Sequence, residues 1–227
     1  MGSERILIVN ADDFGHSPEV NAGVIEAHER GIVTSASLMV DRPSAREAAA
    51  YRGRLALGLH VELGEWRCVE GRWLATGAVG PEAVEGDVRR QLAAFEELAG
   101  RAPTHVDSHQ HVHRRGPARS AVAALGRELR VPVRHLDPEV RYVGAFYGQT
   151  DEGAPLPELV TTAALVKLIR DLTPGTTELG CHPAKGPVRG SSYAAERERE
   201  LEALCDPLVR SVLERERIDL RSFAELR

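Results

Sequence analysis

Along the chain, short apolar runs alternate with longer segments of mixed polarity. The runs predict strands over residues 5–9, 34–40, 55–60, 104–107, 132–135, 177–181 and 218–220. The segments between them predict helices, the first beginning at Ser17-Pro18 and closing at Gly31. The others are expected over about 43–51, 82–99, 117–129, 156–172, 192–204 and 207–216. Residues 64–80 and 136–155 are expected to be loops. Such repeated strand–helix units imply a parallel sheet with crossover helices, either closed as a barrel or open.

Polar side chains of a kind used in catalysis lie at or near the ends of these predicted strands. In chain order they are Asp12 and Asp13, His60, His109, Arg134 and His182. In a barrel, the carboxyl ends of all strands converge on one mouth, where barrel enzymes hold their chemistry. Strands so spread in order would reach one crevice of an open sheet less easily. We therefore expect a (β/α) barrel with about seven parallel strands, as a single domain over residues 1–227.

One short stretch carries a histidine or aspartate at every second position: His105, Asp107, His109, His111 and His113. In an extended segment, side chains two residues apart point the same way. At about 3.3 Å per residue, such neighbours lie roughly 6.6 Å apart and can share a metal ion. The local pairs that fit are Asp107 with His109, and His109 with His111. The alternative is a polar strand end with solvated histidines.

A metal that acts as a Lewis acid needs few protein ligands and an open position, which a carboxylate and two imidazoles provide. The candidates are one of Asp12 or Asp13, with His60 and His109. Bound water would have its pKa lowered from 15.7 to as little as about 7. The second carboxylate could then take its proton. These groups match the hydrolysis of an amide or an ester.

Two more residues extend this chemistry. Arg134 nearby would keep a carboxylate base ionised, and His182 on the opposite side could protonate the leaving group. Each motif also has a structural reading: an Asx turn at Asp12-Asp13, a core histidine at His60, and a strand exit at His182. A thiol nucleophile at Cys181 paired with His182 is disfavoured, because adjacent strand residues face opposite sides.

Composition limits the classes of function. The 227 residues are 42% hydrophobic and 28% charged, an ordinary globular balance. The net charge of -5 argues against nucleic acid or an anionic membrane surface as a partner. No apolar run would span a bilayer, and residues 1–30 lack a signal-peptide pattern. The three cysteines form no disulfide framework, so a cytoplasmic protein is expected. A homodimer is compatible with the sequence.

Several stretches together resemble the YdjC-like carbohydrate deacetylase family, distant relatives of the NodB-type polysaccharide deacetylases. They are Ile8-Val-Asn-Ala-Asp-Asp-Phe-Gly15, Gly31-Ile-Val-Thr-Ser35, Gly58-Leu-His60, Pro103-Thr-His-Val-Asp-Ser-His-Gln-His-Val-His113, Ala145-Phe-Tyr-Gly148, Glu178-Leu-Gly-Cys-His-Pro183 and Ser192-Tyr193. The resemblance runs from the first strand to the last. It implies a distorted (β/α) barrel, one divalent metal ion, and hydrolytic removal of acetyl groups from N-acetylated sugars or short chitin-type oligosaccharides.

The resemblance also implies roles for particular residues. Asp13, His60 and His109 correspond to the metal ligands, Asp12 to the general base, and His182 to the acid for the leaving group. Phe146 and Tyr147 correspond to part of a sugar-binding loop. We place Arg134, His111 and His113 with them as substrate-binding candidates.

Two departures from the family pattern and two alternatives accompany this expectation. Residues 61–87 are short for a member that acts on chitooligosaccharides, and Gln110 follows His109 where some members carry another histidine. One alternative is a phosphoesterase or amidohydrolase-like enzyme with a second ion at His109 and His111. The other is a non-catalytic carbohydrate-binding protein that uses Trp66, Trp73 and Tyr147 for stacking. Mg²⁺ and Zn²⁺ both stay open.

Overall fold

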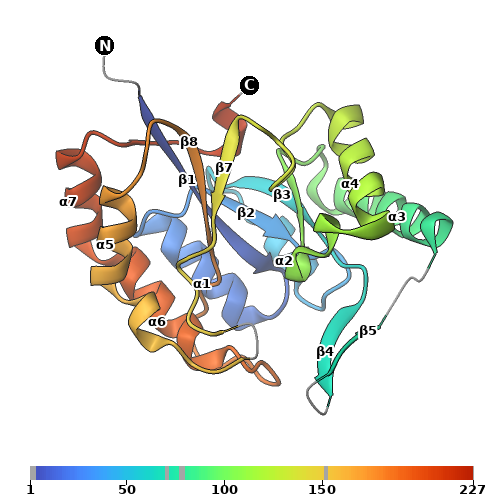
Figure 1. Cartoon of the computed structure of the whole chain (residues 1–227), viewed down its shortest axis with the longest axis horizontal. Coiled ribbons are helices and arrows are strands. Elements are labelled where there is room, and N and C mark those ends of the chain that lie inside the picture. Colours follow the sequence, from blue (N-terminus) through green and yellow to red (C-terminus); the bar gives the residue numbers. More distant parts are fainter. Residues whose placement is uncertain (1–3, 70–71, 77–79, 151–152, 227) are drawn as a thin grey trace.

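A curled parallel sheet forms the centre of the molecule, and helices surround it (Figure 1). The computed structural model describes residues 4–69, 72–76, 80–150 and 153–226, with the backbone alone for 65–69 and 72–76. The strand order is β6-β3-β2-β1-β8-β7, and β9 pairs with β1. The strands are β1 (Arg5–Phe14), β2 (Ser35–Leu38), β3 (Ala56–Val61), β6 (Val106–Ser108), β7 (Val140–Val143), β8 (Gly175–Cys181) and β9 (Asp219–Leu220). Within the described ranges no ladder joins β6 to β7, so this is a half-barrel, and the predicted distorted (β/α) barrel is confirmed.

The helices begin and end largely where the sequence signals indicated. They are α1 (Pro18–Glu29), α2 (Ala45–Ala49), α3 (Pro81–Ala99), α4 (Gly116–Leu129), α5 (Thr162–Arg170), α6 (Ala194–Cys205) and α7 (Pro207–Arg215), with 3-10 turns η1 (His109–Arg114), η2 (Pro157–Val160) and η3 (Phe223–Glu225). The Ser17 side chain caps α1, and Pro18 occupies its first turn. Gly100 ends α3 in the left-handed conformation. In Figure 1, α5, α6 and α7 flank one side of the sheet, while α3 and α4 flank the opposite side.

The core explains why β1 lies at the centre. From Leu7 to Phe14 every residue of β1 is buried, as expected for a strand between two parallel neighbours with both faces covered. Phe14, Phe95 and Phe146 are among the largest fully buried side chains. Most buried apolar residues of the other strands and helices belong to one cluster, and Ile8, Val140 and Phe223 form a second, smaller one.

One strand and two loops assigned from the sequence were wrong. Residues 132–135 form only a single parallel bridge, between Val133 and Val106, because the chain turns back at once, with the N–H groups of Leu136 and Asp137 donating to the Val133 carbonyl. The expected loop over 136–155 contains β7, which pairs along β8 through Val140–Val143. The expected loop over 64–80 contains an antiparallel hairpin of β4 (Glu65–Val69) and β5 (Arg72–Thr76). Trp66 and Trp73 were predicted to stack on a ligand, but their side chains lie outside the described part of the structure.

The predicted extended row of histidines was also wrong. The strand β6 ends at Ser108, and the chain then turns through η1. Gln110 and His111 adopt left-handed backbone angles, with φ of 52° and 51°. Their side chains therefore leave the alternation: the His109 ring contacts His60, while the His111 ring contacts His113. Sequence spacing by itself cannot detect such a turn, because Gln and His are compatible with either geometry.

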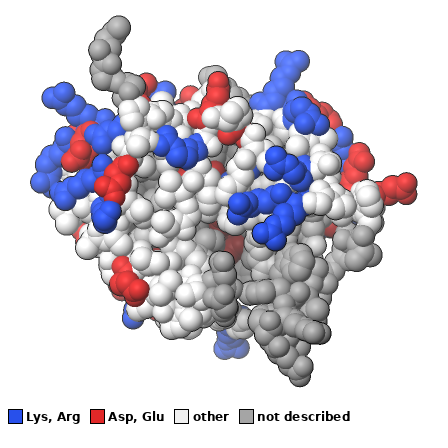
Figure 2. Space-filling model, in the orientation of Figure 1, with Lys and Arg blue, Asp and Glu red and all other residues white. Residues whose placement is uncertain are grey.

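The visible surface carries both signs of charge. Figure 2 shows Lys and Arg side chains over α5 and α7 and beside α4, with Asp and Glu side chains among them. Mixed charge of this kind is ordinary for a protein surface. In the described ranges no helix combines the length and the apolar character needed to cross a bilayer.

Candidate active site

An irregularity in β1 brings two adjacent carboxylates to one site. In a regular strand, neighbouring side chains point to opposite faces. Here the pairing of β1 with β2 shifts register between Ala11 and Phe14, and Asp13 has a φ of 63°. A left-handed non-glycine residue is strained, and such strain is concentrated at functional sites. The irregularity re-aims the Asp13 side chain, so that Asp12 and Asp13 both line the mouth of the half-barrel.

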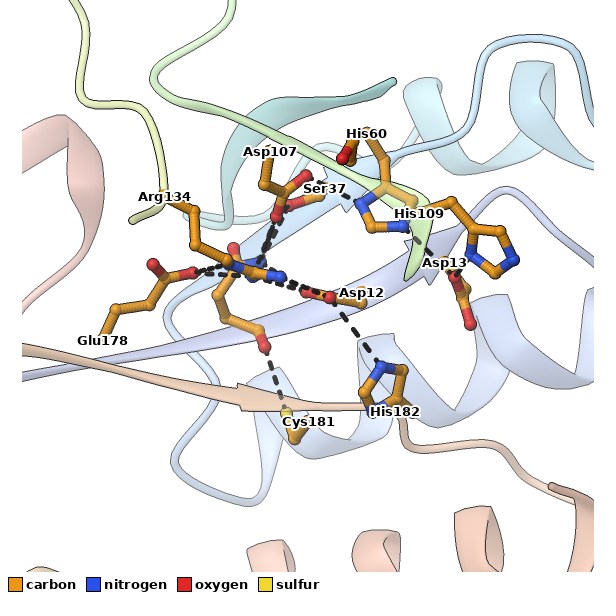
Figure 3. A network of polar contacts seen from close by, with 12 residues as sticks. Asp12, Asp13, Ser37, His60, Asp107, His109, Arg134, Glu178, Cys181 and His182 are labelled. Carbon is orange, nitrogen blue, oxygen red and sulfur yellow. Dashed lines mark hydrogen bonds and ion pairs between the residues drawn. The ribbon is translucent and has the colours of Figure 1, made fainter. Parts of the chain in front are cut away.

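Asp13 meets two imidazoles from different elements. The Oδ1 atom of Asp13 lies 3.4 Å from Nε2 of His60 and 3.2 Å from Nδ1 of His109. His60 belongs to β3, while His109 opens η1 directly after β6 (Figure 3). One donor atom from each of the three residues lies within 4.8 Å of the others. The structure therefore brings together the three residues predicted to be metal ligands.

The polar surroundings of His60 fit a cation. Its Nδ1 lies 2.7 Å from Oδ1 of Asp107, which is its register partner across the β3–β6 ladder. Its Nε2 is buried and, apart from the 3.4 Å contact with Asp13, has no hydrogen-bond partner among the described residues. A buried imidazole nitrogen without a partner is costly unless an ion or a donor completes it. A carboxylate on the far nitrogen is the usual support for a metal-binding histidine. The donor set of Asp13, His60 and His109 thus fits a divalent ion.

A second group of donors fits a cation less well. Asp12, His60 and Asp107 also lie within 4.8 Å of one another and are fully buried. However, the Arg134 guanidinium already contacts Asp12 and Asp107. A second cation there would face this fixed positive charge. Among the described residues, neither group of three candidate ligands includes His111, so no such group joins His109 to His111 for the second ion of the alternative reading.

Arg134 contacts the buried carboxylates that lie beside the candidate metal ligands (Figure 3). Its guanidinium holds both oxygens of Asp12 in a fork, at 2.6 and 2.7 Å, and also contacts Glu178 of β8 at 2.6 Å. Burial alone would raise the pKa of Asp12, but the charge and hydrogen bonds of Arg134 bring it below its ordinary value. Burial raises the pKa of Glu178 to about 7. Asp12 is therefore held as a carboxylate at neutral pH.

His182 faces Asp12 from the end of β8. Its Nε2 lies 3.8 Å from Oδ2 of Asp12, and its ring is 20% exposed. Burial lowers the pKa of His182 to about 4, so the resting imidazole is neutral at pH 7. The ring edge meets Tyr147 and Tyr193, which stack in parallel with centroids 4.5 Å apart. The two tyrosine rings therefore pack against His182, which in turn faces Asp12.

The remaining substrate-binding candidates divide by exposure. Phe146 and His113 are fully buried, and Arg134 has a side chain only 1% exposed, so none of the three offers side-chain surface to a ligand in this structure. Instead, Nε2 of His113 donates to the carbonyl oxygen of Arg134, and the backbone N–H of His113 donates to the Ser108 hydroxyl, which ties η1 to the sheet. Tyr147 and His111 are partly exposed, and His111 packs edge-on against His135 and Tyr142.

Several residues of the site were not identified from the sequence. They are Asn10, Ser37, Glu178, Tyr193, Arg197 and Glu200. Asp107 was predicted only as a partner of His109 for an ion, and the structure pairs it with His60 instead. A glutamate inside an apolar run, as at Glu178, is a usable signal, because a buried charge needs a partner. Arg197 and Glu200 lie in a helix rich in exposed charges, where nothing in the sequence separates the buried ones from the rest.

Comparison with known proteins agrees with this geometry. The model of the family described as YdjC-like protein matches residues 6–215. A carbohydrate deacetylase from Geobacillus stearothermophilus is 36% identical, over 98% of this chain and 99% of that protein. A chitooligosaccharide deacetylase from Serratia marcescens is 32% identical, over 98% and 100%. A crystal structure from Enterococcus faecalis, provisionally named for cellobiose-phosphate cleavage, superposes with a TM-score of 0.82 at 26% identity, over 99% of both chains. The chain belongs to the YdjC-like family.

Proposed function

We propose that this protein is a metal-dependent deacetylase that hydrolyses the acetamido group of N-acetylated sugars or short oligosaccharides. One observation carries the proposal: the donor atoms of Asp13, His60 and His109 converge within 4.8 Å, beside a carboxylate that is not needed as a ligand. The activities named for the relatives from Geobacillus stearothermophilus and Serratia marcescens support the choice of substrate class.

Asp13, His60 and His109 would hold the ion. Two imidazoles and one carboxylate favour Zn²⁺ or another transition ion over Mg²⁺, which prefers oxygen ligands. When bound, the ion supplies Lewis acidity to the amide carbonyl and lowers the pKa of the attacking water. The Nδ1 contact of His60 with Asp107 keeps Nε2 directed at Asp13 and away from solvent.

Asp12 would act as the general base. It is ionised at neutral pH and lies next to the ligand Asp13, while Arg134 holds both of its oxygens. The proton that Asp12 takes from water must reach the leaving nitrogen for the products to be an amine and acetate. His182 would receive that proton and pass it on; its neutral resting state and its 3.8 Å separation from Asp12 support this role. Tyr147 would pack against the sugar ring beside it.

The proposal is tested by acetate release. Purified protein would be stripped with a chelator, reloaded with Zn²⁺, Co²⁺ or Mg²⁺, and incubated with N,N′-diacetylchitobiose and a panel of N-acetylhexosamine derivatives. We expect acetate and free amine in equal amounts, dependent on added ion. A metal-loaded protein that releases no acetate from the panel contradicts the proposal. Turnover of a phosphoester panel by the same protein would assign a different reaction.

A further inference from the structure

Arg197 is a buried arginine on the helix α6, and its side chain is only 7% exposed. Its NH2 group donates to Oδ2 of Asp13, and its NH1 group donates to the carbonyl oxygen of His182 at 3.2 Å. The guanidinium carbon also lies 5.7 Å from the centroid of the Tyr193 ring. One side chain therefore contacts the ends of both β1 and β8.

The contact with Asp13 leaves one carboxylate oxygen for other partners. Oδ2 is bonded to Arg197, while Oδ1 is the atom that faces His60 and His109. Asp13 also has a strained backbone, with φ of 63°, so its side-chain direction is not fixed by ordinary strand geometry. A hydrogen bond from a rigid guanidinium fork supplies that direction.

We propose that Arg197 is a positioning residue, which holds Asp13 so that Oδ1 alone is offered to the metal ion. The same side chain fixes the distance between this ligand and His182 through the carbonyl of residue 182. This inference rests on the proposed function, because it assigns a role toward the ion that Asp13, His60 and His109 would bind.

The positioning effect of Arg197 and the repulsion from its charge have opposite effects on metal affinity, so an experiment can distinguish them. A positive guanidinium near a divalent ion repels it, and simple electrostatics predicts that loss of the charge tightens binding. Positioning predicts the reverse, because supporting groups of metal ligands typically contribute 10- to 100-fold in affinity. Arg197→Lys keeps the charge but loses the planar fork, whereas Arg197→Met loses both.

The experiment is a Co²⁺ titration of metal-stripped protein by calorimetry, with the visible spectrum of bound Co²⁺ as a second readout. Arg199→Lys is the matched control, since Arg199 is exposed on the same helix. We expect wild type and Arg199→Lys to bind one equivalent with the same affinity. Arg197→Lys and Arg197→Met should each bind about 10- to 100-fold more weakly, with altered Co²⁺ absorption.

Three results overturn the inference. They are wild-type affinity in Arg197→Lys, tighter binding in Arg197→Met, and an unchanged spectrum in both variants. Thermal melts of the metal-free proteins report whether each variant folds, and if Arg197→Met does not, Arg197→Lys decides alone. A wild-type protein that binds no Co²⁺ contradicts the proposed function itself, which distinguishes the two failures.

Discussion

The Nδ1 atom of His60 lies 2.7 Å from Oδ1 of Asp107, directly across the ladder between β3 and β6. Because this contact occupies one ring nitrogen, it determines that the other, Nε2, faces Asp13. The second oxygen of Asp107 contacts Ser37 and Arg134, which fixes the carboxylate in turn. The parallel register of two strands thus orients a candidate metal ligand before any ion is bound.

Removing this support should weaken metal binding. We expect Asp107→Ala to lower the affinity for Zn²⁺ or Co²⁺ about 100-fold, and Asp107→Asn about 10-fold, since an amide oxygen can still accept from Nδ1. Competition with a chromophoric chelator measures both. The control is Asp171→Asn, an exposed carboxylate next to the last residue of α5. Wild-type affinity in Asp107→Ala would remove Asp107 from the site.

Asp12 should be needed for turnover but not for metal binding. Asp12→Asn keeps the size of the side chain and an acceptor for Arg134, but it cannot take a proton at neutral pH. We expect the rate of acetate release to fall about 10²- to 10⁴-fold, which is typical for loss of a general base. Metal stoichiometry should stay at one per chain, because Asp12 lies outside the Asp13 triad. A variant with more than a tenth of wild-type turnover would contradict the assignment.

The positions of the principal site residues were predictable because strand ends follow from hydrophobic runs. Once the run before Asp12 and the run around Gly58-Leu-His60 are read as parallel strands, their carboxyl ends must share one edge of the sheet. The family motifs then separated Asp13 from Asp12 as the expected ligand. The structure brings Asp13, His60 and His109 together as that prediction required.

The features of the site that could not be predicted depend on the backbone angles of single residues and on which charged side chains of a helix are buried. Asp13, Gln110 and His111 adopt left-handed backbone angles. Glycine is the usual sequence signal for such angles, and none of these positions is a glycine. In α6, Arg197 and Glu200 are buried while Glu198 and Arg199 are exposed, although the sequence alternates charge through all four. Only the packing of α6 against α1, α5 and η2 determines which charges turn inward.

A tight contact in the core predicts a large effect from one methyl group. A Cβ atom on Gly58 would lie 2.4 Å from the ring of His105. That ring is confined, because it stacks on Phe223 at 4.0 Å and contacts Ser37 at 3.1 Å. We expect Gly58→Ala to lower the free energy of unfolding by about 1–3 kcal/mol, the usual cost of overpacking. Equilibrium urea unfolding measures it.

The control for this prediction has the opposite sign. Gly86 lies inside α3, and nothing lies within 4 Å of a Cβ atom built there. Gly86→Ala should therefore raise the free energy of unfolding by about 0.5–1 kcal/mol, through helix propensity alone. Equal stability of the two variants would show that the His105 ring moves aside without cost.

The buried carboxyl group of Glu200 should make the free energy of unfolding depend on pH. It accepts hydrogen bonds from the His182 backbone N–H and from the Tyr193 hydroxyl, and burial raises its pKa from 4.5 to about 8. Between these values the folded protein keeps a proton that the unfolded chain releases. The free energy of unfolding must then fall as pH rises through this window, and the loss is complete above pH 8.

Glu200→Gln imitates the protonated carboxyl and does not titrate. Its stability relative to wild type, measured by urea unfolding from pH 5 to pH 9, should therefore increase up to about pH 8 and then level off. Other titrating groups occur in both proteins and cancel in the difference. Glu202→Gln, an exposed carboxylate on the same helix, controls for the loss of a charge from α6. If the difference for Glu200→Gln is the same at every pH, Glu200 is ionised in the folded protein and burial does not control its proton.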